Sequence, residues 1–168
     1  MRWIGEALWL IAAAITYAVY GPLLGINDAV PILTVIVIVR VALTSGPLAG
    51  NITGFAGGLL LDVSTPEWFG AAMLVDSIIG FVVGMMRERI VLDSPLARFV
   101  VLLVAAVTHS LGIVVMRSFV TPDMAPEPFI NALGSGSYTA ILGGVWWTLC
   151  GVIRAVIGWR SIWYVERQ

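Results

Sequence analysis

Long apolar stretches, separated by short polar or glycine- and proline-containing turns, occupy most of this chain. An α-helix needs about 20 residues to cross the roughly 30 Å hydrocarbon core of a bilayer. The pattern therefore predicts an all-α integral membrane protein, in which residues 1–168 form a single domain of six transmembrane helices. The predicted helices cover residues 3–20, 29–43, 46–61, 69–86, 96–116 and 138–158.

The second and third predicted helices are short, and the sequence Ser45-Gly46-Pro47 makes a tight turn between them. Glycine and proline together are a strong turn signal. The alternative to two full spans is a single re-entrant hairpin that enters and leaves the bilayer on the same side.

Charged residues are distributed unequally between the two ends of the predicted helices. With the N-terminus in the cytoplasm, Arg117 is the only arginine on the outer side. Because arginine in short loops favours the cytoplasm, the pattern predicts that both termini are cytoplasmic. The cytoplasmic side then carries Arg2, Arg40, Arg87, Arg89, Arg98, Arg154, Arg160 and Arg167, and the outer side carries Asp28, Asp62, Glu67, Asp123 and Glu127.

Composition supports a membrane protein and excludes several other classes. Charged residues make up 11% of the chain and hydrophobic residues 60%, with a mean hydropathy of +0.99; soluble domains have about 25% charged residues. A net charge of −1 argues against nucleic-acid binding, which needs clustered cations. Cys150 is the only cysteine, so the chain has no internal disulfide and no cysteine-based metal site. Without clustered His, Asp or Glu, we expect no enzymatic activity, metal or cofactor.

The longest predicted loop runs from residue 117 to residue 137. It contains three prolines and two glycines, Pro122, Pro126, Pro128, Gly134 and Gly136. This composition predicts an irregular outer loop that is too short to form a domain. Function is therefore expected in the helical bundle or on its surface.

The third predicted helix carries a regular row of small residues. Gly46, Gly50, Gly54 and Gly58 recur every four residues, and Asp62 continues the row. Residues four apart lie on one helical face, and small residues let two membrane helices approach closely. The row predicts either internal packing against a neighbouring helix or a docking groove for the transmembrane helix of a partner.

The sequence around this row resembles the MreD family, small bacterial inner-membrane proteins of the machinery for rod shape and cell elongation. The resemblance rests on Arg40, on Gly46-Pro47-Leu48-Ala49-Gly50, on Gly54-Phe55-Ala56-Gly57-Gly58-Leu59-Leu60-Leu61-Asp62, and on the next apolar segment with Gly80, Gly84, Arg87 and Arg89. It implies a non-enzymatic scaffold subunit that binds an MreC-like membrane protein. It also implies that the chain functions alongside the rod-complex glycosyltransferase and transpeptidase and the MreB-like filament. Membrane lipid is a further expected contact.

The family resemblance also implies a fold similar to the substrate-binding subunits of energy-coupling-factor transporters. This keeps open a second function, that of a substrate-binding subunit of a vitamin or small-solute importer, because fold does not fix function. Ala14 and Ala18 are spaced like the small-residue motif with which such subunits dock.

Four further polar residues fall within predicted membrane helices. Asp76 and His109 lie seven residues from the outer ends of their helices, so we predict that they form a pair, with a ligand pocket as the alternative. Arg40 and Asn51 lie at a similar depth on the cytoplasmic side, and we predict a hydrogen bond between them. Asp62, at the outer end of the glycine row, is expected to bind backbone N–H groups of the following turn or a cation of a partner.

Overall fold

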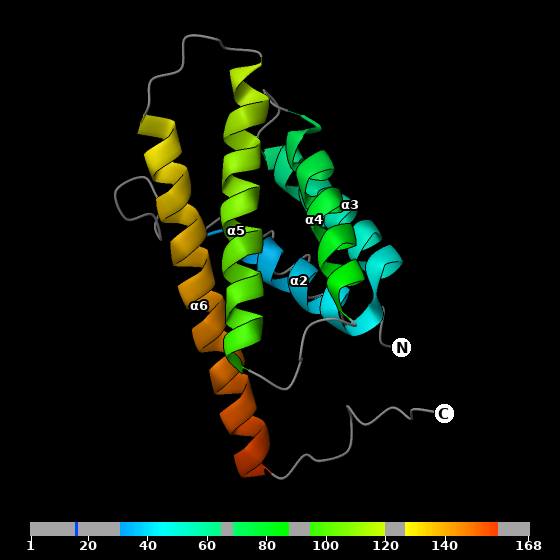
Figure 1. The fold of residues 1–168 in the computed structure, drawn as a ribbon, viewed down its shortest axis with the longest axis vertical. Helices are drawn as coiled ribbons and strands as arrows, with labels where there is room; N and C mark the ends of the chain where they lie inside the picture. The colour runs from blue at the N-terminus through cyan, green and yellow to red at the C-terminus, as the bar shows by residue number, and fades with distance from the viewer. Residues whose placement is uncertain (1–15, 17–30, 65–68, 88–94, 120–126, 158–168) are drawn as a thin grey trace.

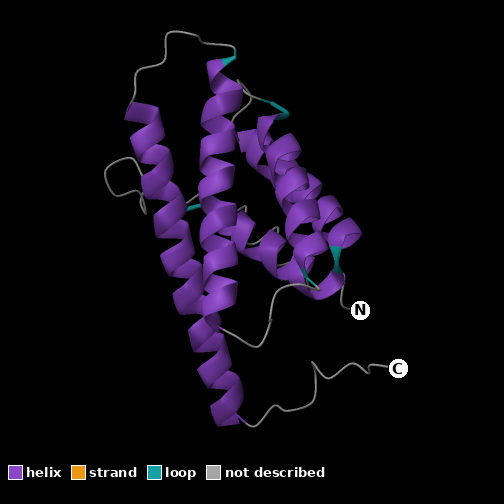
Figure 2. Ribbon diagram, viewed as in Figure 1, coloured by secondary structure: helices purple, strands orange, loops and turns teal. Residues whose placement is uncertain are grey.

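The computed structural model describes Thr16 and residues 31–64, 69–87, 95–119 and 127–157. Apart from short turns these residues are helical, and no strand occurs among them (Figure 2). The all-α class predicted from the sequence is confirmed. The predicted first helix, residues 3–20, lies outside the described residues except for Thr16, which is helical. The others are α2 (Leu33–Ser45), α3 (Pro47–Ser64), α4 (Ala71–Met86), α5 (Pro95–Ser118) and α6 (Glu127–Ile157).

The helices form two antiparallel pairs with α2 between them. The long helices α5 and α6 lie side by side, α3 and α4 form the second pair, and α2 runs across the space between the pairs (Figure 1). On α2, Val35, Val39 and Ala42 are fully buried, and they belong to one hydrophobic cluster with Ile79 of α4 and Leu102 of α5. The shortest of the described helices therefore contributes a large share of the core.

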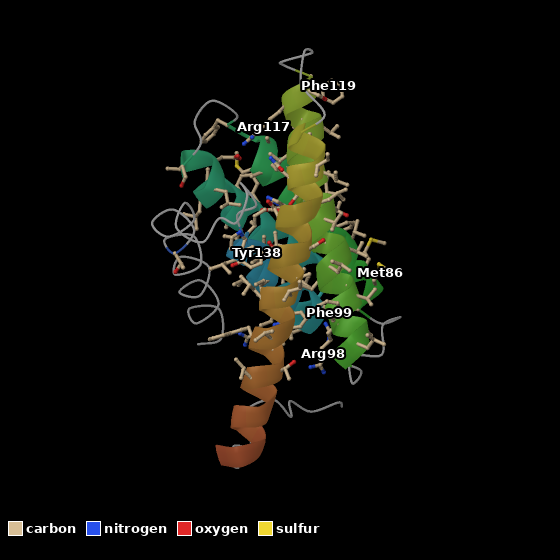
Figure 3. All side chains as sticks on the ribbon, turned by 90° about the vertical axis from the view of Figure 1, so that its left-hand side faces the viewer. Met86, Arg98, Phe99, Arg117, Phe119 and Tyr138 are labelled. Atoms are coloured by element: carbon tan, nitrogen blue, oxygen red, sulfur yellow. The ribbon has the colours of Figure 1, made fainter. Side chains whose placement is uncertain are left out.

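Among the described residues, one helical segment is long and apolar enough to cross a membrane. It is Leu96–Ser118 within α5, and Arg98 and Arg117 lie near its two ends (Figure 3). Helices α2 and α4 are apolar but shorter. With 13 residues, α2 is about 20 Å long and is by itself too short to cross about 30 Å of hydrocarbon.

The prediction of an irregular loop up to residue 137 is wrong for its last part, because α6 begins at Glu127 rather than near residue 138. Pro128 is the second residue of this helix, where its missing N–H would have had no partner in the helix. The backbone of Val107 on α5 approaches Gly136 so closely that a Cβ there would lie 2.7 Å from the Val107 Cα. This glycine, interpreted as a turn signal, is a close-packing position on a helix.

Candidate functional site

The glycine row of α3 faces α4 at backbone contact. A Cβ on Gly54 would come closer than 3.0 Å to the carbonyl oxygen of Asp76, and the same holds for Gly58 with the carbonyl of Ala72. Gly50 and Gly80 approach each other reciprocally, each facing the carbonyl oxygen of the other. Each step of four residues along α3 is matched by four in the opposite direction along α4. Such proximity allows Cα–H···O contacts and dense packing between the two backbones.

The prediction that this row is a docking groove for a partner helix needs correction. Gly50, Gly54 and Gly58 are buried, and α4 fills the face that they present. A partner helix could reach them only by displacing α4. The sequence left two alternatives open, internal packing and partner docking, and the structure shows internal packing. Small residues of α4, such as Ala72 and Gly80, lie opposite Gly58 and Gly50 of the row.

Gly46 is the first residue of the row in sequence, but it forms a turn and is not part of a helix. It lies at the turn between α2 and α3, with a φ angle of 92° that favours glycine. Its backbone N–H donates to the Ala42 carbonyl at 3.0 Å and so closes the end of α2. The guanidinium of Arg87, at the end of α4, approaches the same turn, with Nη1 3.5 Å from the position that a Cβ would take.

Asp62, at the other end of the row, caps α4. Its Oδ2 accepts hydrogen bonds from the backbone N–H groups of Gly70 and Met73, both at 3.0 Å, and its Oδ1 accepts one from Ala72 at 3.0 Å. The side chain is buried, and the residue is 2% exposed. A carboxylate at a helix N-terminus satisfies otherwise unpaired N–H groups and is favoured by the helix dipole. Of the two expected partners, backbone N–H groups and a cation, the structure provides the N–H groups.

Asp76 and His109 meet between α4 and α5. The distance from Nδ1 of His109 to Oδ1 of Asp76 is 2.5 Å, and both side chains are buried. The contact expected from their matched depths is therefore present. The second carboxylate oxygen, Oδ2, is also buried and has no hydrogen-bond partner among the described residues. Because Gly54 touches the backbone of Asp76, the glycine row and this polar pair share one position on α4.

The hydrogen bond between Arg40 and Asn51 stays a prediction. Nδ2 of Asn51 donates to the Ser77 carbonyl on α4, at 3.3 Å. Asn51 is thus another link between α3 and α4, and the reason is again the short distance between these helices, which brings a backbone acceptor within reach.

One polar contact was not predicted from the sequence. The backbone N–H of Ile32, just before α2, donates to Oγ1 of Thr139 on α6 at 2.9 Å, and the Thr139 hydroxyl donates to the Ser135 carbonyl at 2.7 Å. Thr139 is fully buried. A threonine in the middle of an apolar helix is a weak signal of such a bond, and its partner lies 107 residues away in sequence.

Comparison with known proteins decides the family. A family model described as "rod shape-determining protein MreD" matches residues 1–149. This match covers most of the 168 residues, including all of α2 to α5 and α6 up to residue 149. The chain belongs to the MreD family. No curated protein and no solved structure matches it significantly. Membership makes this MreD-family chain a bacterial membrane protein with a role in determining rod shape.

In this MreD-family chain, no group of three His, Cys, Asp or Glu residues that could hold a metal ion occurs among the described residues. The buried carboxylates instead contact parts of the same chain: Asp62 caps α4, and Asp76 binds His109. These polar residues hold helices together.

A double-mutant cycle tests whether the Asp76–His109 contact contributes to the stability of the MreD-family chain. Asp76→Asn and His109→Ala should each lower the free energy of unfolding, and the double variant should lose less than the sum of the two. Polar contacts in membrane bundles typically contribute about 0.6 kcal/mol and at most about 2 kcal/mol. Reversible unfolding of the purified chain in detergent gives the coupling energy. Additive effects would mean that the contact contributes nothing.

Proposed function

We propose that this chain is a non-enzymatic scaffold subunit of the bacterial cell-elongation complex, and that it binds an MreC-like membrane protein. The observation that carries the proposal is the match to a rod shape-determining family over residues 1–149. Through its partner, the scaffold would help to organise lateral peptidoglycan synthesis by the glycosyltransferase and transpeptidase alongside the MreB-like filament. The importer alternative has no support from the comparisons.

We further propose six membrane-crossing segments with cytoplasmic termini, of which α2 forms only part of one, because it is too short to span by itself. The α3–α4 pair supports this orientation, because Asp62 lies beside the start of α4 and Arg87 beside Gly46 at the opposite end. Acidic and basic residues therefore occupy opposite ends of the pair, and the positive-inside rule assigns the Arg87 end to the cytoplasm.

Cysteine labelling tests this orientation. Cysteines replacing Ser94 and Ala125, both outside the described residues, would be introduced singly into a Cys150→Ser background. In intact spheroplasts, a membrane-impermeant maleimide should label position 125 and leave position 94 unlabelled. A permeant maleimide should label both and serves as the control. Labelling of position 94 but not position 125 by the impermeant reagent would contradict the proposed orientation.

The partner surface we propose is the outward face of α3. Because α4 fills the glycine row, a partner helix on α3 must contact the opposite side, where Leu48, Ile52, Phe55 and Val63 are each more than half exposed. Successive members lie four, three and eight residues apart, spacings of about one or two helical turns, and therefore form one stripe along the helix. Phe55 lies at mid-helix, where an aromatic side chain offers the largest contact area.

Complementation in rod-shaped cells that lack the native chain tests both the function and the surface. The unchanged chain should restore rod shape and co-purify with the MreC-like protein. Phe55→Ala should keep normal membrane levels but reduce co-purification, with cells becoming rounder. Ile141→Ala, a truncation of another exposed apolar side chain, on α6, is the matched control and should behave like the unchanged chain. If the unchanged chain restores shape without retaining an MreC-like protein, the proposed partner is wrong.

A further inference from the structure

The outward face of the α3–α4 pair is apolar except at one place. Within residues 48–63 of α3 and residues 74–86 of α4, the polar residues that are not buried are Asn51 and Ser77. The other polar residues of these segments are buried, namely Thr53, Asp62 and Asp76. Asn51 and Ser77 adjoin across the two helices, because Nδ2 of Asn51 donates to the Ser77 carbonyl. They form a single polar patch in an apolar surface, here called the Asn51–Ser77 patch.

The Asn51–Ser77 patch faces away from the core. Phe55 is four residues after Asn51, and Phe81 is four residues after Ser77, so each phenylalanine shares a helical face with its patch residue. Phe55 is 53% exposed and Phe81 is 44% exposed. The α3–α4 pair lies on the side of the described bundle that is remote from α6 (Figure 1). Because α3 and α4 are antiparallel, the two phenylalanines flank the patch, one toward each end of the pair.

The patch has more hydrogen-bonding capacity than its internal bond uses. An asparagine amide has two donor hydrogens and an acceptor oxygen, and the bond to the Ser77 carbonyl occupies one of the donors. At 3.3 Å this bond is long, since N–H···O bonds are usually about 2.9–3.0 Å. The acceptor is the backbone carbonyl of Ser77, so the Ser77 hydroxyl takes no part in the bond. In an apolar bilayer, polar groups of this kind stabilise contact with a second helix that brings its own donor or acceptor.

We propose that the Asn51–Ser77 patch binds a serine, threonine, asparagine or glutamine side chain of the partner's transmembrane helix. The inference rests on the proposed function and its partner surface on α3, and it adds the chemistry by which that surface selects a helix. Apolar residues such as Phe55 supply contact area, whereas one polar contact within an apolar helix interface fixes the register of the two helices. Asn51 is four residues from the start of α3 at Pro47. In the proposed orientation, the partner's polar residue therefore lies about 6 Å from the cytoplasmic end of the pair.

Two variants of the purified full-length chain test the patch, with binding of a fluorescently labelled MreC-like protein measured in neutral detergent. Asn51→Leu keeps the approximate size of the side chain and removes the amide. Ser77→Ala removes the hydroxyl but leaves the internal bond, which goes to the backbone. Each should raise the dissociation constant about threefold or more, the effect of one typical polar contact in a membrane bundle. The control, Thr148→Ala, removes an exposed hydroxyl of α6 that bonds to the Gly144 carbonyl and should bind normally.

Double-mutant cycles with the partner identify the polar residue that binds the patch. Each serine, threonine, asparagine and glutamine in the transmembrane helix of the MreC-like protein is replaced singly by leucine. One of these changes, in the cytoplasmic half of that helix, should weaken binding to the unchanged chain and have little further effect on binding to Asn51→Leu.

The polar contact and the proposed function fail in different ways. The polar contact is wrong if Asn51→Leu and Ser77→Ala both bind as tightly as Thr148→Ala, or if every change in the partner helix is additive with Asn51→Leu. Weak binding by Phe55→Ala together with normal binding by Asn51→Leu would leave the partner surface in place and contradict the polar contact alone. If the unchanged chain binds no MreC-like protein, the proposed partner is wrong, and the polar contact with it.

Discussion

Gly54→Ala should lower the free energy of unfolding by about 3 kcal/mol or more, because the added Cβ would overlap the backbone carbonyl of Asp76. Overpacking a close-packed core typically costs about 1–3 kcal/mol. Here the upper end applies, since the atoms that would have to move belong to the backbone of α4 and not to a flexible side chain. Unfolding of the purified variant in detergent measures the loss. Gly54→Leu should leave little folded protein in the membrane.

Gly112→Ala, on α5, is the matched control. Its Cβ would meet the Val75 side chain, with the nearest atom Cγ1 at 2.9 Å. A side chain can move more easily than a helix backbone, so this variant should lose about 1 kcal/mol. Equal losses for the Gly54 and Gly112 variants would show that α3 and α4 do not touch at Gly54.

The Gly54 variants also separate packing from partner docking. If this residue faced a partner, Gly54→Leu would leave normal amounts of protein in the membrane and abolish co-purification with the MreC-like protein. Because Gly54 contacts α4, we expect the reverse order: the amount of protein falls first, and partner binding falls only in proportion. Phe55→Ala, which changes the adjacent outward residue, should show the opposite behaviour.

Much of the α3–α4 pair could be predicted from the sequence, because local signals mark it. The turn at Gly46 and the glycine repeat set the beginning of α3 and its close-packing face. However, a glycine repeat identifies the close-packing face of a helix but not the helix that packs against it. The identity of that second helix depends on residues far away in the sequence. The small residues at Gly80 and Gly84 of α4 match the row in spacing, and this match is the signal that could have identified the neighbour.

The pairing of Asp76 and His109 could be anticipated because matched depth limits the partners of a buried charged group. The beginnings of α2 and α6 could not be anticipated in the same way. Apolar residues precede α2 as well as form it, so the hydropathy pattern does not mark where this helix begins. The Ile32–Thr139 bond, which lies at its start, is a tertiary contact between residues far apart in sequence. At the start of α6, Pro128 is compatible with an irregular loop and equally with the first turn of a helix. Composition alone therefore favoured a loop where the structure has a helix.

Asp62→Ala should lower the free energy of unfolding by about 2–4 kcal/mol, the second large effect that we expect. Loss of an N-cap side chain costs about 0.5–2 kcal/mol, and a hydrogen bond to a charged group contributes about 1.5–3 kcal/mol. Asp62 accepts three such bonds in a buried position, so alanine would leave the N–H groups of Gly70, Ala72 and Met73 without acceptors. Chemical unfolding of the purified chain in detergent measures the loss.

Two further variants attribute this effect to the cap. Asp62→Asn keeps one side-chain oxygen but places an amide NH₂ against a backbone N–H. Its free energy of unfolding should therefore lie between those of Asp62→Ala and the unchanged chain. Ser64→Ala removes an exposed hydroxyl at the end of the same helix, which bonds to the Leu60 carbonyl at 3.3 Å, and should stay within about 0.5 kcal/mol of the unchanged chain. If Asp62→Ala were as stable as Ser64→Ala, the carboxylate would not cap α4. The start of α4 would then be held by packing against the glycine row alone.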